Sequence, residues 1–406
     1  MGFAPYGVGY GIVYGVVSGR AWVVNQSVWH GGQIYQAAMR LGRPMKSIVD
    51  FSASINPLGP PPSVLRAIRR HLSDCRYYPD SQGTALRNRL AEYHGVSPEF
   101  IALGNGSAEL IRLLPWALGI RSGYVLGPTF MEFERALQLA GARSFALHGD
   151  AVKGYPVPLE QLDRVLGAVP RGCTNAQGQA KVKTKRLKSA VFVCNPNSPT
   201  GRVVPRSRLL QLCRVLEEQG MWVVVDEAFM DFVPSHSMLS QVPRHRQLVV
   251  LRSFTKFYGM PGIRLGYVVG PPEAIQRIQA HLPPWSVSHI AQVAGLAALA
   301  DDGFRRQTLQ FIRVTRMQFS RDLRTIPGLR VYPSRVNFVM VEFPKLCSMT
   351  QLVKWLEQHG ILVRDCRTFS GICTSTIRLA VRRPSENARL VRLLRRFIHD
   401  YCGDKA

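Results

Sequence analysis

The chain of 406 residues is long enough for two domains, or for one large domain with a smaller satellite. Its 52 basic and 26 acidic residues give a formal net charge of +26, but no RRM, zinc-finger or helix-turn-helix pattern is present, so we favour an enzyme of anionic substrates over a dedicated nucleic-acid binder. The eight cysteines are scattered without a C-x-x-C pair, which argues against zinc-ribbon and thioredoxin-like classes and suits a reducing cytoplasm.

Residues 1–29 form a segment of unusual composition. Within it, residues 7–24 are rich in Gly, Val and Tyr and almost free of charge. The segment lacks the basic n-region and A-x-A site of a signal peptide, and its glycines and short length argue against a membrane span. We expect a disordered extension, or a reading frame that starts too far upstream.

The pattern after residue 30 predicts an α/β fold. It begins with a helix over 34–41, a strand over 50–56 and a helix over 64–71 that is capped by Ser63. From 77 to 289, short apolar strands alternate with amphipathic helices, which predicts a mostly parallel sheet. The clearest strands are 124–126, 191–193, 223–225 and 249–251, with 266–269 as an antiparallel addition.

The remainder of the chain predicts a second, smaller domain. A long helical stretch begins near residue 291, and α+β elements follow it. We expect residues 30–76 and 291–406 to form the small domain, beside a large domain of residues 77–290. A polar, Lys-rich stretch, residues 171–189, predicts a solvated basic loop inserted before a core strand. The clearest C-terminal elements are strands 337–342 and 376–380 and a helix over 386–401.

Lys256 is the most informative residue, because it lies in the run S-F-T-K-F-Y-G-M-P-G-I-R. A lysine amine can condense with the aldehyde of pyridoxal phosphate if part of its population is neutral, and burial near other cations lowers its pKa. Ser253 and Arg264 could hold the cofactor phosphate, for which the planar guanidinium is well suited. An ordinary basic loop is the alternative.

Two further segments have the chemistry that such a cofactor needs. Asp226 ends the apolar run W-V-V-V, and ligands of open α/β sheets bind outside the carboxyl ends of strands. The cofactor ring accepts electrons only when its nitrogen is protonated, so an acid is needed there, although Asp226 could merely cap the next element. The turn L-G-N-G-S-A-E-L opens a helix, and its free N–H groups at Gly106, Ser107 and Ala108 suit a phosphate.

The order of these segments resembles fold-type I pyridoxal phosphate enzymes of the aminotransferase class I/II group. The glycine turn is followed by N-P-N-S-P-T-G, D-E-A-F and S-F-T-K. The likeness to threonine-phosphate decarboxylases of cobalamin synthesis is closer still, from about residue 30 to residue 397; histidinol-phosphate aminotransferases are the nearest group outside that branch. The segments that carry it are H-G-G-Q at 30–33, D-F-S-A-S-I-N-P-L-G-P-P at 50–61, Y-P-D at 78–80, D-E-A-F-M-D-F at 226–232 and P-W-S-V at 284–287.

The resemblance implies pyridoxal 5'-phosphate as cofactor and homodimers whose active sites draw residues from both subunits. Lys256 would bind the cofactor covalently and donate a proton, and Asp226 would hold the pyridinium. Phe130 would stack on the ring, with simple core packing as the alternative. Tyr78 would reach the cofactor phosphate from the partner subunit. The other residues implied at the cofactor are Gly106, Ser107, Ala108, Ser198, Ser253 and Arg264.

Two arginines are candidate substrate clamps. Arg378 is a charge inside the apolar strand T-I-R-L-A, which is costly unless it is paired, so it binds either a substrate anion or a structural acid. The resemblance implies the same role for Arg364, although Asp365 beside it could pair with it. His30 and Gly31 match the segment that folds over the substrate phosphate. The remaining implied substrate contacts are Ser54, Asn56 and Ser198.

Three positions depart from the patterns of relatives. Ser198 stands where Asn usually precedes P-T-G, with Asn197 one step earlier, and Ser54 stands where the decarboxylases have Asn. Phe229 replaces the Tyr of aminotransferases, a change that is typical of the decarboxylase branch. The two serines leave the chemistry possible and put substrate preference in doubt.

We therefore expect decarboxylation of L-threonine O-3-phosphate, with no metal ion, no membrane and no specific nucleic acid. The same residues could instead transaminate, and the choice rests on the 30–61 stretch. Histidinol-phosphate aminotransferase is the alternative within the class. A nucleic-acid-binding regulator with an aminotransferase-like domain is the alternative outside it, although no segment offers a DNA-binding module.

Overall fold

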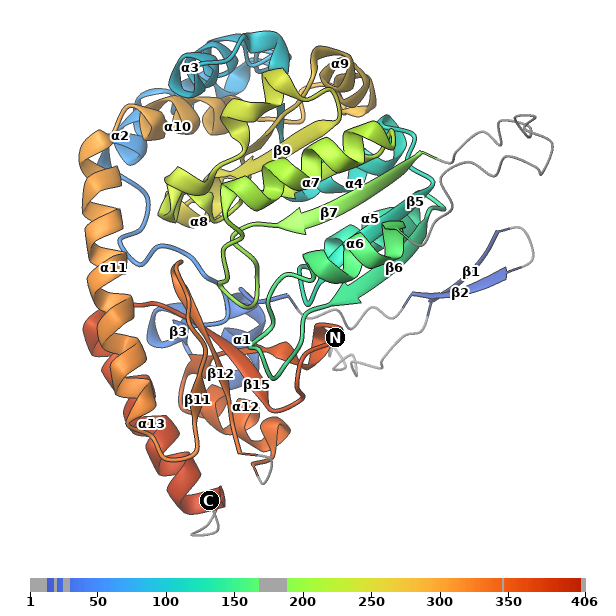
Figure 1. Ribbon diagram of the computed structural model, residues 1–406. Coiled ribbons are helices and arrows are strands. Elements are labelled where there is room, and N and C mark those ends of the chain that lie inside the picture. The colour runs from blue at the N-terminus through green and yellow to red at the C-terminus, as the bar shows by residue number, and fades with distance from the viewer. Residues whose placement is uncertain (1–12, 18–19, 25–29, 168–187, 345–346, 403–406) are drawn as a thin grey trace, which may run out of the picture.

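A seven-stranded sheet forms the centre of the larger part of the molecule (Figure 1). The computed structural model describes residues 13–17, 20–24, 30–167, 188–344 and 347–402. The strand order is β4-β10-β9-β8-β7-β5-β6; β10 is antiparallel to both neighbours and the other pairs are parallel. The strands are β4 Ile101–Gly104, β5 Ser122–Gly127, β6 Arg143–His148, β7 Ser189–Cys194, β8 Trp222–Asp226, β9 Leu248–Ser253 and β10 Gly266–Val269.

The central strands are apolar runs because helices cover both faces of the sheet (Figure 1). On one face, α4, α5 and α9 pack through side chains such as Leu114, Phe133 and Ile278. On the other, α6 and α7 pack through Leu162 and Leu212. The predicted α/β fold, with a mostly parallel sheet and an antiparallel β10, is confirmed. These helices are α4 Ser107–Ala117, α5 Glu132–Leu139, α6 Leu159–Gly167, α7 Arg206–Glu218 and α9 Pro272–His281, with α3 Thr84–His94 and α8 Phe254–Phe257.

The smaller part joins the two ends of the described chain. Its four-stranded sheet has the order β11-β12-β15-β14, and β3 from the N-terminal segment pairs in parallel with β13 (Figure 1). This pairing is the arrangement that the two-part small domain requires, while the domain limits themselves stay a prediction. The elements of this part are β3 Val49–Asp50, β11 Arg330–Val331, β12 Phe338–Glu342, β13 Ile361–Leu362, β14 Arg364–Asp365, β15 Thr376–Ala380, α1 Ile34–Leu41, α11 Asp302–Arg324, α12 Met349–Gln358 and α13 Pro384–Cys402. By contrast, α2 Pro62–Arg70 and α10 His289–Leu299 pack on each other beside α3 of the larger part (Figure 1).

Two local predictions in the N-terminal part are wrong. Ser63 does not cap α2: the helix begins at Pro62, where the fixed φ of proline suits the first turn, and Ser63 Oγ donates to Asp301 Oδ2 at 2.6 Å. The strand expected over 50–56 ends at Asp50. The chain turns there because Ser52 N and Ser52 Oγ both donate to Asp50 Oδ1, at 2.7 and 2.5 Å, in place of ladder bonds.

The expected extension and the expected basic loop lie mostly outside the described residues. Within the first 29 residues, β1 (Val13–Val17) and β2 (Arg20–Val24) pair as an antiparallel hairpin where disorder was expected, in keeping with their Val-rich sequences. Of the segment 171–189, only the last two residues are described, and Ser189 already belongs to β7.

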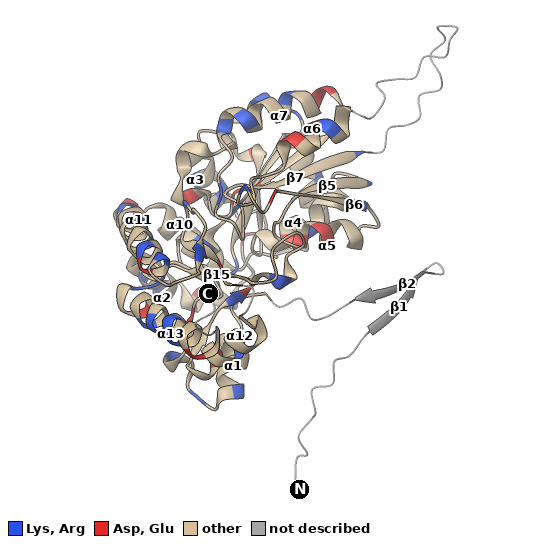
Figure 2. Ribbon diagram, turned by 60° about the horizontal axis from the view of Figure 1, so that its bottom comes forward, with Lys and Arg blue, Asp and Glu red and all other residues tan. Residues whose placement is uncertain are grey.

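The basic residues are distributed over many elements. In Figure 2, Lys and Arg positions are scattered over α7, α11 and α13 and are not gathered on one of them. This distribution suits the expected basic background better than a dedicated nucleic-acid interface. In the part of the chain that the structure covers, no helix has the length and apolarity that a membrane crossing needs.

The cysteines give a mixed indication of compartment. Five described cysteines carry free thiols, whereas Cys347 is disulfide-bonded. A disulfide is not typical of a reducing compartment, so the cytoplasm stays a prediction. The free thiols are those of Cys75, Cys194, Cys213, Cys366 and Cys373.

Candidate functional site

A cavity of about 340 Å³ opens where the carboxyl ends of β7, β8 and β9 face β14 and β15 of the smaller part. A larger hollow of about 430 Å³ lies beside α6, but it contains no lysine opposite a buried strand-end acid. The smaller cavity brings together most of the predicted site residues: His30, Gly31, Ser107, Ala108, Phe130, Ser198, Asp226, Ser253, Lys256, Arg264, Arg364 and Arg378. Its lining also includes Arg112, Glu132 and Cys194, which were not predicted.

Lys256 lies on α8, the short helix that follows β9. Ser253 caps this helix by accepting a hydrogen bond from Thr255 N at 3.2 Å, which fixes the turn that directs the lysine into the cavity. Burial, together with the positive charges of Arg378 and Arg264, lowers the pKa of Lys256 to about 8. A large fraction of the amine is therefore neutral at mildly alkaline pH, as attack on an aldehyde requires.

The rate of cofactor uptake by cofactor-free protein should follow this pKa. Only the neutral amine reacts, so the rate is expected to rise as pH increases through about 8 and to level off above it. The measurement is the growth of the visible absorbance band after mixing with pyridoxal phosphate between pH 6 and pH 10. A rate that still climbs steeply at pH 10 would show that Lys256 has the pKa of an ordinary lysine and would contradict the prediction.

Asp226 lies at the carboxyl end of β8, and its side chain is buried in the cavity floor. Its Oδ1 accepts a hydrogen bond from Ala228 N at 2.9 Å. Burial and the charge of Glu227 raise the pKa of Asp226 to about 6, against the opposing hydrogen bond from Ala228 N. The protonated ring nitrogen of a bound cofactor would supply the positive charge that the buried carboxylate of Asp226 needs to stay ionised. Glu227 faces elsewhere and forms a buried ion pair with Arg252 at 3.0 Å.

One end of the cavity has the geometry of a phosphate cradle. Gly106 has φ +81° directly before α4, and a Cβ there would lie 2.5 Å from Arg264 Nη2. A Cβ on Gly266 would lie 2.4 Å from Ser107 N. Both glycines therefore let backbone and guanidinium approach closely around the first turn of α4, where free N–H groups attract anions. Ser253 completes this end of the lining.

Arg364 and Arg378 lie directly opposite each other on the antiparallel strands β14 and β15. Arg378 donates to Ser198 Oγ at 2.7 Å and to Ser52 O at 3.0 Å, while its buried Nε has no hydrogen-bond partner in the described part of the chain. Burial, together with the charge of Arg364, lowers the pKa of Arg378 to about 10. Two neighbouring guanidinium groups in one cavity favour a bound anion.

The carboxylate of Asp365, which the sequence placed beside Arg364 as a possible partner, pairs with Arg367. Both oxygens of its carboxylate accept hydrogen bonds from Arg367, at distances between 2.6 and 3.1 Å. Arg364 donates to Thr368 Oγ1 at 2.9 Å, and its guanidinium lies over the ring of Phe369 at 4.8 Å. The charge of Asp365 is thus engaged by another arginine.

Four predicted site residues do not line the cavity: Gly106, which lies just before the phosphate cradle, and Asn56, Ser54 and Tyr78. Asn56 corrects a substrate assignment: its Nδ2 donates to Phe257 O and Thr308 Oγ1, at 2.8 and 2.9 Å, so its amide holds the loop that follows β3. Ser54 is fully buried beside the cavity, and its carbonyl accepts from Asn337 Nδ2 at 2.9 Å. Tyr78 is 79% exposed, and its ring centroid lies 4.5 Å from that of Trp285, so its contact with the cofactor phosphate of a partner subunit stays a prediction.

The unpredicted group consists of Glu132 and Arg112 with His30. Glu132 Oε1 lies 3.0 Å from His30 Nε2, and its Oε2 accepts from Arg112 Nε and Nη2, both at 3.3 Å. The hydrogen bond from His30 lowers the pKa of Glu132 against the effect of burial. The only sequence signal was a carboxylate two residues after Phe130, which by itself indicated no role.

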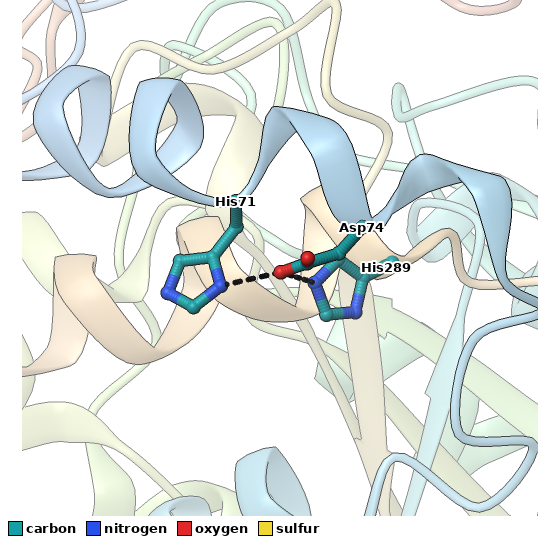
Figure 3. A group of neighbouring side chains, drawn as sticks. All are labelled: His71, Asp74 and His289. Carbon is teal, nitrogen blue, oxygen red and sulfur yellow. Dashed lines mark hydrogen bonds and ion pairs between the residues drawn. The ribbon is translucent and has the colours of Figure 1, made fainter.

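A second cluster of ionisable side chains lies away from the cavity, where η2 (Leu72–Arg76) meets α10. Asp74 Oδ2 lies 2.9 Å from His71 Nδ1 and 3.6 Å from His289 Nε2 (Figure 3). Ordinary hydrogen bonding and ion pairing account for this geometry, so it supports no metal assignment. The expected absence of a metal stays a prediction.

The residues present fit the cofactor. The cavity holds a lysine with a lowered pKa, a buried acid at a strand end, a glycine-lined helix start beside a guanidinium, and an arginine with an unsatisfied Nε. Lys256 would hold the aldehyde, Asp226 the ring nitrogen, and Ser107, Ala108, Ser253 and Arg264 the phosphate. Together the fold and the site define an enzyme that uses pyridoxal 5'-phosphate.

Comparison with known proteins agrees with this class. Residues 46–394 match the family described as aminotransferase class I and II, and the chain belongs to that family. It is 33% identical over 368 residues to the threonine-phosphate decarboxylase of Salmonella typhimurium, covering 90% of this chain and 95% of that protein. It is 30% identical to the histidinol-phosphate aminotransferase of Methanothermobacter thermautotrophicus, covering 90% and 92%. A solved histidinol-phosphate aminotransferase from Sinorhizobium meliloti, in complex with pyridoxal-5'-phosphate, superposes with a TM-score of 0.77 at 25% identity, covering 92% and 96%.

Proposed function

We propose that this enzyme decarboxylates L-threonine O-3-phosphate to (R)-1-amino-2-propanol O-2-phosphate for cobalamin synthesis. The position of Arg378 carries the proposal. Its side chain is buried, its positive charge lowers the pKa of Lys256, and Arg364 lies directly opposite it on the neighbouring strand. A substrate carboxylate held there lies next to the amine that must receive and return protons. The similarity to a threonine-phosphate decarboxylase supports the same choice.

In the proposed reaction the chain's residues bind, orient and move a proton. Arg378 and Arg364 hold the substrate carboxylate, and Ser198 Oγ holds the guanidinium of Arg378 in place. Pyridoxal phosphate, when bound, supplies an electron-accepting ring for the pair of electrons left at Cα as CO₂ departs. Lys256 then delivers its proton to Cα, which balances the loss of the carboxylate. Asp226 keeps the ring nitrogen protonated.

Two companion proposals follow from the same family. We infer a homodimer in which Tyr78 reaches the partner's cofactor site, supported by its exposure and by its stacking on Trp285. Transamination of histidinol phosphate is the second candidate activity, favoured by the 30% identity to an enzyme of that name. Histidinol phosphate has no carboxylate, but the 2-oxoglutarate that would accept its amino group has one, so the position of Arg378 suits both candidates. The 33% identity to a threonine-phosphate decarboxylase favours the first.

The activities separate in one assay of the wild-type enzyme. With pyridoxal phosphate and L-threonine O-3-phosphate, we expect release of CO₂ without any keto acid, and little reaction with threonine itself. The phosphate is nearly a dianion at neutral pH and gains most from a cationic cavity. If the enzyme instead requires 2-oxoglutarate and forms glutamate from histidinol phosphate, the decarboxylase proposal fails and the aminotransferase proposal stands.

A further inference from the structure

Glu132 is a buried carboxylate among cations at the mouth of the cavity. Its side chain is 5% exposed, whereas those of His30 and Arg112 are 41% and 48% exposed. Oε1 of Glu132 bonds to His30 and Oε2 accepts from Arg112, while Arg135 approaches Oε1 at 3.7 Å. A buried acid with both oxygens engaged fixes two cationic side chains in one orientation.

His30 is also fixed from the other side, through the backbone. Gly31 packs so closely on the next strand end that a Cβ there would lie 2.2 Å from Ser52 O. Gly32 N donates to Ser52 Oγ at 2.8 Å, and Ser52 O accepts from Arg378. The segment of residues 30–32 is therefore held between the clamp arginine and Glu132, and it brings His30 over the mouth of the cavity.

Besides the phosphate cradle, the cavity thus contains basic side chains at two separate places. Arg378 lies at the buried end of the cavity, where its positive charge lowers the pKa of Lys256. His30 and Arg112 are half-exposed at the mouth, and they line the same cavity. A substrate with an anion on each side of its amine-bearing carbon would satisfy both groups. The second anion is held by a histidine and an arginine, a combination that suits phosphate.

We propose that Glu132 is a positioning residue that holds His30 and Arg112 as a subsite for the phosphate group of the substrate. This inference rests on the proposed use of a phosphorylated substrate, and it deepens that proposal by naming the group that meets the distal anion. Without the carboxylate, His30 and Arg112 lose the partner that holds both of them at the mouth of the cavity. The subsite would serve the phosphate of either candidate substrate, because both carry one.

The test uses the holoenzyme and two half-substrates. O-Phosphoethanolamine carries the phosphate without the carboxylate, and L-threonine carries the carboxylate without the phosphate. Binding of each is followed by the change in cofactor absorbance, in wild type and in Glu132→Gln. We expect the affinity for O-phosphoethanolamine to fall about tenfold or more and that for threonine to change less than about twofold. Glu132→Asp should restore part of the loss.

Matched controls separate positioning from a structural role. Glu134→Gln alters the same helix outside the cavity lining and should leave both affinities unchanged. Arg112→Gln tests the subsite through a half-exposed side chain, if Glu132 variants fail to fold, and should reproduce the selective loss. An equal loss for both ligands, or no loss for either, would overturn the proposal.

The outcomes also distinguish this subsite from the proposed reaction. If wild-type enzyme binds O-phosphoethanolamine through Glu132 and Arg112 but releases no CO₂ from L-threonine O-3-phosphate, the subsite stands and the decarboxylase proposal fails. If it releases CO₂ while Glu132→Gln binds both half-substrates normally, the reaction stands and the subsite fails.

Discussion

Replacement of Lys256 by alanine is expected to abolish both the visible absorbance band of the bound cofactor and turnover. The side chain is the amine in the cavity that faces the buried acid Asp226, and its pKa of about 8 gives it the neutral population that covalent attachment needs. It is also the proposed proton donor to Cα. General acid–base catalysis alone contributes about 10²- to 10⁴-fold, so kcat should fall by at least about 10³-fold.

Two measurements check this outcome. Reduction with borohydride should fix the cofactor to the wild-type chain and not to Lys256→Ala, as peptide mass analysis would show. Lys153→Ala is the control, because Lys153 is exposed and lines a different hollow. A variant that keeps the band and is modified by borohydride at another lysine would remove Lys256 from the mechanism. A colourless wild type that takes up no pyridoxal phosphate would contradict the cofactor assignment itself.

Replacement of Arg378 by alanine should lower kcat/KM for L-threonine O-3-phosphate by well over tenfold, which is more than about 1.4 kcal/mol of lost transition-state stabilisation. The guanidinium is buried, and its hydrogen bonds to Ser198 and Ser52 leave Nε without a partner among the described residues. Its removal takes away the anion contact nearest Lys256. The cofactor absorbance should stay intact, because Arg378 is assigned to the substrate and not to the cofactor.

A lysine at this position separates charge from geometry. Arg378→Lys keeps the positive charge and loses the planar fork, so we expect a partial loss of kcat/KM with the cofactor still bound. Arg382→Ala, just beyond the end of β15 and outside the cavity lining, is the matched control. If Arg378→Ala loses the cofactor and the substrate together, the residue serves the structure of the site and its role as a substrate clamp is wrong.

The parts of the site that were predicted from sequence are those fixed by local structure. The run W-V-V-V-D specifies a buried strand with an acid at its end, and the lysine follows the next strand within one short helix. Adjacent parallel strands place such residues at one edge of the sheet. The assignments of Asp226 and Lys256 to one cavity therefore required only strand ends and chain order.

Features that depend on contacts between distant segments were not predictable in the same way. Glu132 meets Arg112 where α5 packs on α4, and it meets His30 only where the distant N-terminal segment reaches the cavity. Asn56 was assigned to substrate from a motif, but the direction of its side chain is decided by Phe257 O and Thr308 in other parts of the chain. Ser63 had the right type for a helix cap, yet Pro62 already starts the helix and Asp301 takes the hydroxyl.

The pairing of β3 with β13 sets an order of assembly during synthesis. Chains emerge from the ribosome N-terminal end first, and residues 101–269 can build the seven-stranded sheet before residues 361–362 exist. Until then β3 lacks its partner strand β13, and the 30–32 segment lacks the Arg378 that binds Ser52 O. The substrate side of the cavity is therefore a property of the finished chain, in which the first and last segments have met, whereas the residues assigned to the cofactor, from Ser107 to Arg264, all belong to the part that is made earlier.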